Sequence, residues 1–284
     1  MFKNCLILFF ALMISGSINA QAGILNAKDP DQIGKKSEQQ KAADNDGPIP
    51  YGYVDDRDVL WSKVVWEFID LNQKINLPYY FPIDTTNISS DRRSLFDTLI
   101  KGIKQGKIKE AYSDSFFTSK ITQNEIDSRM SSIREENGYS DTIRLQTQDV
   151  EGYMIKGMWY FDKRQGELKY RLLALAPMGK DVQTLGIQDI EDEELYELFW
   201  VFFPSIRDVL HDAKVFNPKN ASQPISFDHM LNARRFSSTI VREENIYGNR
   251  AISDYVRGNS LFQLLEANKI KEDIRNREMD MWNY

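Results

Sequence analysis

Alternating apolar and polar residues are clearest between Gly152 and Pro177, where they predict a β-hairpin. A polar stretch ending in Gly166 supplies the turn between the two strands. Two strands alone are not stable in water, so a third should pair beside them. The apolar run Leu198–Phe203, closed by Pro204, is the expected partner. The apolar face of the first strand consists of Tyr153, Ile155, Gly157, Trp159 and Phe161.

Apolar residues at three- and four-residue steps predict helices elsewhere in the chain. The strongest pattern spans Asp55–Asn76 and is apolar over a wide face, which predicts a central helix. A final amphipathic helix is expected from Leu261 to the C-terminus. Further helices are expected over Ser94–Ile108, near Asn124–Ile133, after Pro204 and from Ser226, with an extended segment over Phe236–Val241.

These elements predict an α+β fold in which a small antiparallel sheet packs against several helices. The sheet is expected to consist of the hairpin 152–177 and the strand 198–203. Large apolar side chains on the inward faces are expected to form the core. They are Trp61, Trp66, Phe68, Trp159, Phe161, Leu172, Phe199 and Trp200.

The N-terminus has the pattern of a Sec signal peptide over residues 1–22. Lys3 precedes the apolar run Leu6–Ile14, which is too short to span a bilayer, and Ala20-Gln21-Ala22 offers a cleavage site. The alternative is a buried N-terminal helix. Residues 23–50 are polar and predict a disordered arm, either a plain leader or a segment that orders on a partner. Residues 51–284 are expected to form one α+β domain.

Net charge and cysteine content limit which partners and which chemistry the chain can have. The 284 residues carry a net charge of −6, which gives a nucleic-acid partner no electrostatic support. The only cysteine is Cys5, inside the predicted signal peptide, so the exported chain is expected to have no disulfide and no thiol chemistry. No later stretch is long and apolar enough to be a membrane span.

The sequence contains none of the short motifs that mark nucleotide, metalloprotease or serine-hydrolase sites. The two histidines, His211 and His229, lack metal-ligand spacing. We therefore expect no enzyme activity, no metal and no cofactor. A carboxylate pair for sugar hydrolysis is the alternative. Its possible members, each with a structural use as well, are Asp70, Asp162, Asp228 and Asp254.

Aromatic residues allow two interpretations. They could line an exposed sugar-binding face, but aromatic residues beside apolar neighbours are more often core. The residues concerned are Tyr79, Tyr80, Trp159, Tyr160 and Trp200.

The acidic stretch Asp189–Glu197 is expected to be a solubilising loop, because its spacing is not that of a calcium loop.

Several motifs in order resemble the gliding-motility protein N family, GldN/PorN. The segment D58-V-L-W-S-K-V-V-W-E-F-I-D-L-N-Q-K-I-N76 carries the clearest resemblance, which extends over roughly Tyr51 to Tyr284. The other matching motifs are S94-L-F96, W159-Y-F-D162, F199-W200, F216-N-P218, S226-F-D228, F236-S-S238, R250-A-I-S-D-Y255 and D280-M-W282.

The resemblance implies a periplasmic, non-enzymatic component of the type IX secretion system. It implies binding to a lipoprotein of the GldK/PorK type, in a ring of copies below the outer membrane. It also implies contact with the GldL–GldM (PorL–PorM) motor, and a membrane association only through the lipoprotein. The alternative function is a stand-alone periplasmic module that binds glycan or peptidoglycan.

A ring subunit needs contact surfaces, and the C-terminal helix is one candidate. Its side chains could dock on a neighbour or on the lipoprotein, or they could fold back on their own core. The residues are Ile270, Ile274, Met281, Trp282 and Tyr284. Separately, Asp84-Thr85-Thr86 resembles the short O-glycan acceptor of bacteria that carry this system, which makes Thr85 a candidate glycosylation site.

Overall fold

The computed structural model describes residues 47–83, 92–136, 139–185, 195–217 and 225–281. All of them except Gly47 belong to one compact unit, formed by residues 48–84 and 92–284. Several sequence predictions concern residues outside the described ranges. They are the signal peptide, most of the predicted arm, Thr85, most of the acidic stretch, Trp282 and Tyr284.

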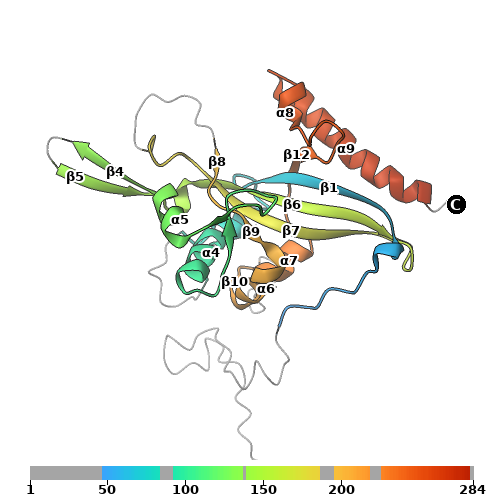
Figure 1. Cartoon of the computed structure of the whole chain (residues 1–284), viewed down its shortest axis with the longest axis horizontal. Coiled ribbons are helices and arrows are strands. Elements are labelled where there is room, and N and C mark those ends of the chain that lie inside the picture. The colour runs from blue at the N-terminus through green and yellow to red at the C-terminus, as the bar shows by residue number, and fades with distance from the viewer. Residues whose placement is uncertain (1–46, 84–91, 137–138, 186–194, 218–224, 282–284) are drawn as a thin grey trace, which may run out of the picture. The chain divides into compact units, whose positions relative to one another are not determined.

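The centre of this unit is a six-stranded antiparallel sheet with the order β12-β1-β6-β7-β8, in which β9 also pairs with β7 (Figure 1). The predicted hairpin is confirmed as β6 (Val150–Asp162) and β7 (Glu167–Gly179). At the turn, the Asp162 carboxylate accepts the backbone N–H groups of Arg164 and Gln165. Gly166 follows at φ 64°, a conformation that glycine adopts without strain. The remaining strands are β1 (Val59–Asp70), β8 (Tyr196–Glu197), β9 (Val201–Phe202) and β12 (Thr239–Glu243).

The predicted helix over Asp55–Asn76 is wrong, because most of this segment forms strand β1. A short 3-10 turn, η2 (Asp56–Asp58), leads into the strand. β1 lies between β6 and β12, and side chains cover its central residues on both faces. A strand covered on both faces is apolar on both, which imitates the wide apolar face of a helix. The sheet is therefore larger than the small one predicted.

The third strand is confirmed in position but is shorter than the predicted Leu198–Phe203. β8 and β9 both pair with β7, and residues 198–200 connect them. In this connection, the Leu198 N–H donates to the Pro177 carbonyl. Phe203 already belongs to helix α6 (Phe203–Asp212). The helix starts there because Pro204 fits a first helical turn, where no N–H is needed.

Most of the other predicted elements are confirmed, with bounds that are shorter or shifted by a few residues. α4 (Leu95–Lys104) begins at the Ser94 cap, and α7 (Phe227–Asn232) begins at the Ser226 cap. The C-terminal helix is α9 (Ser260–Met281). The remaining elements are α3 (Leu77–Tyr80), α5 (Gln123–Arg129), α8 (Ile252–Tyr255), η3 (Thr147–Asp149) and the two-stranded pairs β2–β3 (Ala111–Tyr112, Lys120–Ile121), β4–β5 (Ser131–Glu136, Tyr139–Arg144) and β10–β11 (Lys214–Val215, Ile225–Ser226).

Three apolar clusters hold the sheet and helices together. The largest joins α4, α6 and α7 to the sheet through side chains such as Leu99, Phe203 and Phe227. The second lies under α9, and the third surrounds Trp66 and Trp200. Figure 1 shows α9 beside β1 and β12, whereas α6 and α7 lie beyond β7. Of the expected core residues, Trp66, Phe161, Leu172, Phe199 and Trp200 are buried, whereas Trp61, Phe68 and Trp159 are partly exposed.

Candidate interaction surface at the C-terminal helix

The inner face of α9 packs on the sheet. Ala267, Ile270 and Ile274 are spaced three and four residues apart, so they lie on one side of the helix. All three are buried, in a cluster that includes Val65 of β1 and Ile240 of β12. This contact fixes the position of the helix on the fold.

The opposite face of α9 is also apolar over its first two turns. A helix turns by about 100° per residue, which places Leu261 and Leu265 almost opposite Ile270. The side chains of this face are 45% to 60% exposed. Exposed apolar clusters of this kind mark interaction sites more often than scattered surface residues do. We call the exposed apolar side chains of these turns the outer patch of α9; they are Leu261, Leu264 and Leu265, with Phe262 beside them toward the inner face.

The start of α9 is fixed by a side-chain cap. The Asn259 side-chain oxygen accepts the N–H groups of Leu261 and Phe262, at 3.0 and 3.2 Å. An asparagine in this position satisfies helix N–H groups that have no partner within the helix. The outer patch is therefore held on a capped helical turn.

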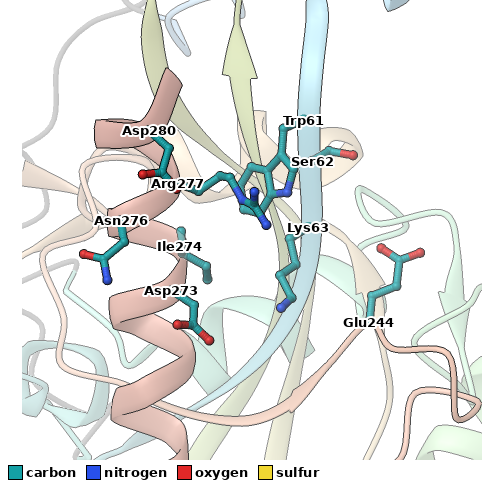
Figure 2. A pocket seen from close by; sticks show the side chains of 9 residues that line it. All are labelled: Trp61, Ser62, Lys63, Glu244, Asp273, Ile274, Asn276, Arg277 and Asp280. Carbon is teal, nitrogen blue, oxygen red and sulfur yellow. The ribbon is translucent and has the colours of Figure 1, made fainter. Parts of the chain in front are cut away.

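A groove separates the C-terminal half of α9 from the first half of β1 (Figure 2). It has a volume of about 580 Å³ and is open to solvent. In Figure 2, Arg277 of α9 and Trp61 of β1 extend toward each other across it. Its lining is mostly polar and charged: Trp61, Ser62, Lys63, Glu244, Asp273, Ile274, Asn276, Arg277 and Asp280.

A buried ion pair fixes the sheet beside this region. The Glu67 carboxylate of β1 is 1% exposed and accepts two hydrogen bonds from Arg234, at 3.1 and 2.8 Å. It also accepts the Ser238 hydroxyl. Burial disfavours the charged form of Arg234, but attraction by Glu67 outweighs it, so the pKa of Arg234 is raised. The Arg234 guanidinium lies 4.0 Å from the Tyr170 ring centre, which adds a cation–π contact.

The Trp66 and Phe116 rings, on the face of the sheet away from Glu67, already contact a cation of the chain itself. Lys156 of β6 places its Nζ 5.0 Å from the Trp66 ring centre and 4.5 Å from that of Phe116. The same nitrogen donates to the Ser115 carbonyl at 2.9 Å. Burial lowers the pKa of Lys156, because it penalises the charged ammonium. These rings are thus occupied by a side chain of the chain itself.

The four candidate carboxylates each take part in local structure. Asp70 accepts the Asn72 N–H, and Asp254 accepts the Ala251 N–H, at 2.9 and 2.8 Å. Asp162 caps the hairpin turn described above. Asp228 holds Arg207 through two hydrogen bonds of 2.7 and 3.0 Å. Within the described residues, no group of three or more His, Cys, Asp or Glu side chains could hold a metal ion.

The aromatic residues considered for a sugar-binding face lie mainly inside the protein. Tyr79, Tyr160 and Trp200 are buried, and Tyr80 and Trp159 are partly buried. The Trp200 indole donates to Glu197 at 2.7 Å, while the Trp159 ring packs against Tyr170. A buried ring cannot reach a sugar, so these residues do not form one exposed face.

The residues predicted to bind a partner have different positions. Ile270 and Ile274 pack on the chain's own core, so neither is available to a partner in this conformation. Met281 is partly exposed. The outer patch was not among the predicted contact residues, because Leu261, Leu264 and Leu265 were counted with Ile270 as one face. The helical angle was the signal that could have separated the two sets.

Comparison with known protein families gives a match over most of the chain. The model of a protein family described as Gliding motility associated protein GldN matches residues 54–283. No curated protein matches the chain. Within the described ranges, no helix combines the length and apolar character needed to cross a membrane.

Proposed function

The chain belongs to the GldN family of gliding motility associated proteins, and from that premise we propose that it is a non-enzymatic subunit of a periplasmic ring. Family membership makes the chain a component of the gliding-motility and type IX secretion machinery. The proposed partners are an outer-membrane lipoprotein of the GldK/PorK type, the GldL–GldM (PorL–PorM) motor and further copies of the chain. The family match over residues 54–283 is the observation that carries the proposal.

The outer patch of α9 is the proposed surface for the lipoprotein. A subunit that passes on force needs contacts on a rigid element, and α9 is fixed to the sheet by its buried inner face. Apolar side chains such as Leu261 and Leu265 gain free energy when a partner covers them. Met281, Trp282 and Tyr284 remain proposed contact residues at the end of the chain, separate from the outer patch.

Export by the signal peptide and a position at the inner face of the outer membrane are parts of the same proposal. The pattern of residues 1–22 supports export. The 23–50 arm and the 51–284 domain remain the proposed organisation of the exported chain.

Co-purification with the lipoprotein tests the proposed surface. The double variant Leu261→Ser/Leu265→Ser removes two exposed side chains of the outer patch. It leaves the buried inner face of α9 unchanged. We expect the double variant to keep the wild-type melting temperature and to lose at least tenfold in lipoprotein recovered from co-expressing cells. Deletion from Ile270 onward is a poor test, because it would remove buried core residues.

A control is Ile133→Ser on β4, which removes an apolar side chain that is even more exposed, at 69%, and is far from α9 in the sequence. The control should recover wild-type amounts of lipoprotein. Equal recovery by the α9 double variant and the control would show that the outer patch is not the binding surface.

A further inference from the structure

Strand β1 forms one side of the groove beside α9 and places an aromatic ring there. Val65 of β1 belongs to the same buried cluster as Ile274 of α9. Alternate residues of a strand point to the same face, so Lys63 and Trp61 also face the helix. Figure 2 shows both side chains extending from β1 toward α9. Trp61 is only partly buried and lines the groove, so part of its indole is open to a ligand.

The other side of the groove is a polar stripe on α9. Asp273, Arg277 and Asp280 are spaced four and three residues apart, so they lie along one side of the helix. All three are exposed and line the groove. Within the described ranges, their side chains form no hydrogen bond or ion pair. The stripe therefore offers two carboxylates and one guanidinium whose hydrogen-bonding groups the described residues do not use.

The charges in the groove are nearly balanced. The Lys63 ammonium is already paired with Glu243 of β12. The α9 stripe then contributes two negative charges and one positive charge. Such a balance gives no strong attraction to a nucleic acid or to a highly basic segment of a protein. It suits a ligand that carries little charge and many groups able to donate and accept hydrogen bonds.

The size and lining of the groove fit a short stretch of sugar rings. Its volume of about 580 Å³ lies in the range of about 300–1,000 Å³ that small-molecule sites show. A sugar ring has a face of C–H groups, which can pack on an indole, and a rim of hydroxyls. Carboxylates accept from hydroxyls, and a guanidinium donates to them. The stripe from Asp273 to Asp280 runs along roughly 10 Å of the helix, so it can contact neighbouring sugar rings.

We propose that the groove between α9 and the first half of β1 binds a segment of a linear, extended glycan. One sugar ring stacks on the Trp61 indole, and hydroxyls of this ring and the next bond to Asp273, Arg277 and Asp280. The groove is open to solvent, so a long polysaccharide can enter it without a free chain end. This binding goes beyond the proposed ring subunit, because it attaches the subunit to a polysaccharide as well as to the lipoprotein.

Titration with soluble oligosaccharides tests the proposal. The probes are the β-1,4-linked tetramer of N-acetylglucosamine and cellotetraose, the corresponding tetramer of glucose. Both have an extended chain, and only the first carries acetamido groups. We expect binding of at least one tetramer to the purified chain in isothermal titration calorimetry, and a difference between the two shows whether the groove requires the acetamido group. Absence of binding by both would overturn the proposal.

A double variant on α9 tests the groove residues. Asp273→Ala/Arg277→Ala removes one acid and one base, so it leaves the net charge and the buried inner face of α9 unchanged. The matched control Glu272→Ala/Arg275→Ala removes one acid and one base from exposed positions of the same helix outside the groove. We expect at least tenfold weaker binding by the groove variant and wild-type binding by the control. Wild-type affinity of the groove variant, or an equal loss in both variants, would sink the assignment of the site.

Trp61→Ala tests the stacking ring. Because Trp61 also packs against the cluster under α9, the melting temperature is measured together with binding. A folded variant should lose binding, and wild-type binding would contradict the stacking; if the variant does not fold, the α9 double variant decides. Leu261→Ser/Leu265→Ser should bind the tetramer normally. The glycan contact and the lipoprotein contact proposed for the outer patch can therefore fail independently.

Discussion

The ion pair between Glu67 and Arg234 makes a strong prediction for stability. Arg234→Met keeps most of the side-chain length but leaves the Glu67 carboxylate buried without its charged partner. Removal of one partner from a buried ion pair costs about 3–5 kcal/mol. The Arg234 side chain is 26% exposed, and Ser238 still donates to Glu67, so we expect the lower end of that range.

Thermal and urea unfolding followed by circular dichroism measure this cost. A loss of about 3 kcal/mol corresponds to a fall of roughly 6–12 °C in the melting temperature of a domain of this size. The double variant Glu67→Met/Arg234→Met removes both charges and should recover most of the loss, to within about 1 kcal/mol of wild type. The reasoning is refuted if Arg234→Met and the single variant Glu67→Met are both neutral, or if the double variant loses the sum of the two single costs.

Three further predictions concern other side chains. Trp200→Ala should cost about 3–5 kcal/mol because Trp200 is fully buried, and Trp159→Ala should cost clearly less because Trp159 is partly exposed; urea unfolding compares them. Lys156 has a lowered pKa in the folded state, so the unfolded chain binds more protons just below the ordinary lysine pKa. The contribution of Lys156 to stability should therefore rise with pH in that window, so the difference in unfolding free energy between the wild type and Lys156→Met should change with pH in that direction. Tyr51→Ala should speed proteolysis near residue 50 without a large fall in melting temperature. Tyr51→Phe keeps the ring between Arg171 and Arg207 and should be cleaved at the wild-type rate. Equal cleavage rates for the two variants would contradict this anchoring role.

Local patterns predicted those parts of the fold that local physics determines. The hairpin was predicted because its alternation, its turn and its glycine all lie within one continuous stretch. Helices α4, α6 and α7 were predicted because a capping serine or a proline marks each start. These signals need no knowledge of distant residues.

The misassigned strand β1 depended on its surroundings. Its residues are apolar on both faces because the strand lies inside the sheet, and this pattern overlaps with that of a buried helix. Its β-branched and aromatic residues, such as Val64, Val65 and Trp66, were the available sign of a strand. The register of β1 against β6 and β12 depends on residues far away in the sequence.

Part of the candidate site could not be predicted from local sequence patterns either. The pair Glu67–Arg234 joins residues 167 positions apart, and the groove brings Trp61 of β1 beside α9 from the other end of the domain. No pattern in the nearby sequence indicates either feature. The outer patch of α9 was within reach, since the angle between Leu265 and Ile270 follows from helix geometry alone.

Sedimentation of native extracts from cells that carry the machinery tests the proposed ring subunit most directly. We predict that the wild-type chain sediments in a large, membrane-associated complex together with the lipoprotein. The Leu261→Ser/Leu265→Ser variant should leave that fraction while remaining folded. A wild-type chain that sediments near the mass of a single copy, apart from the lipoprotein, would contradict the proposed function.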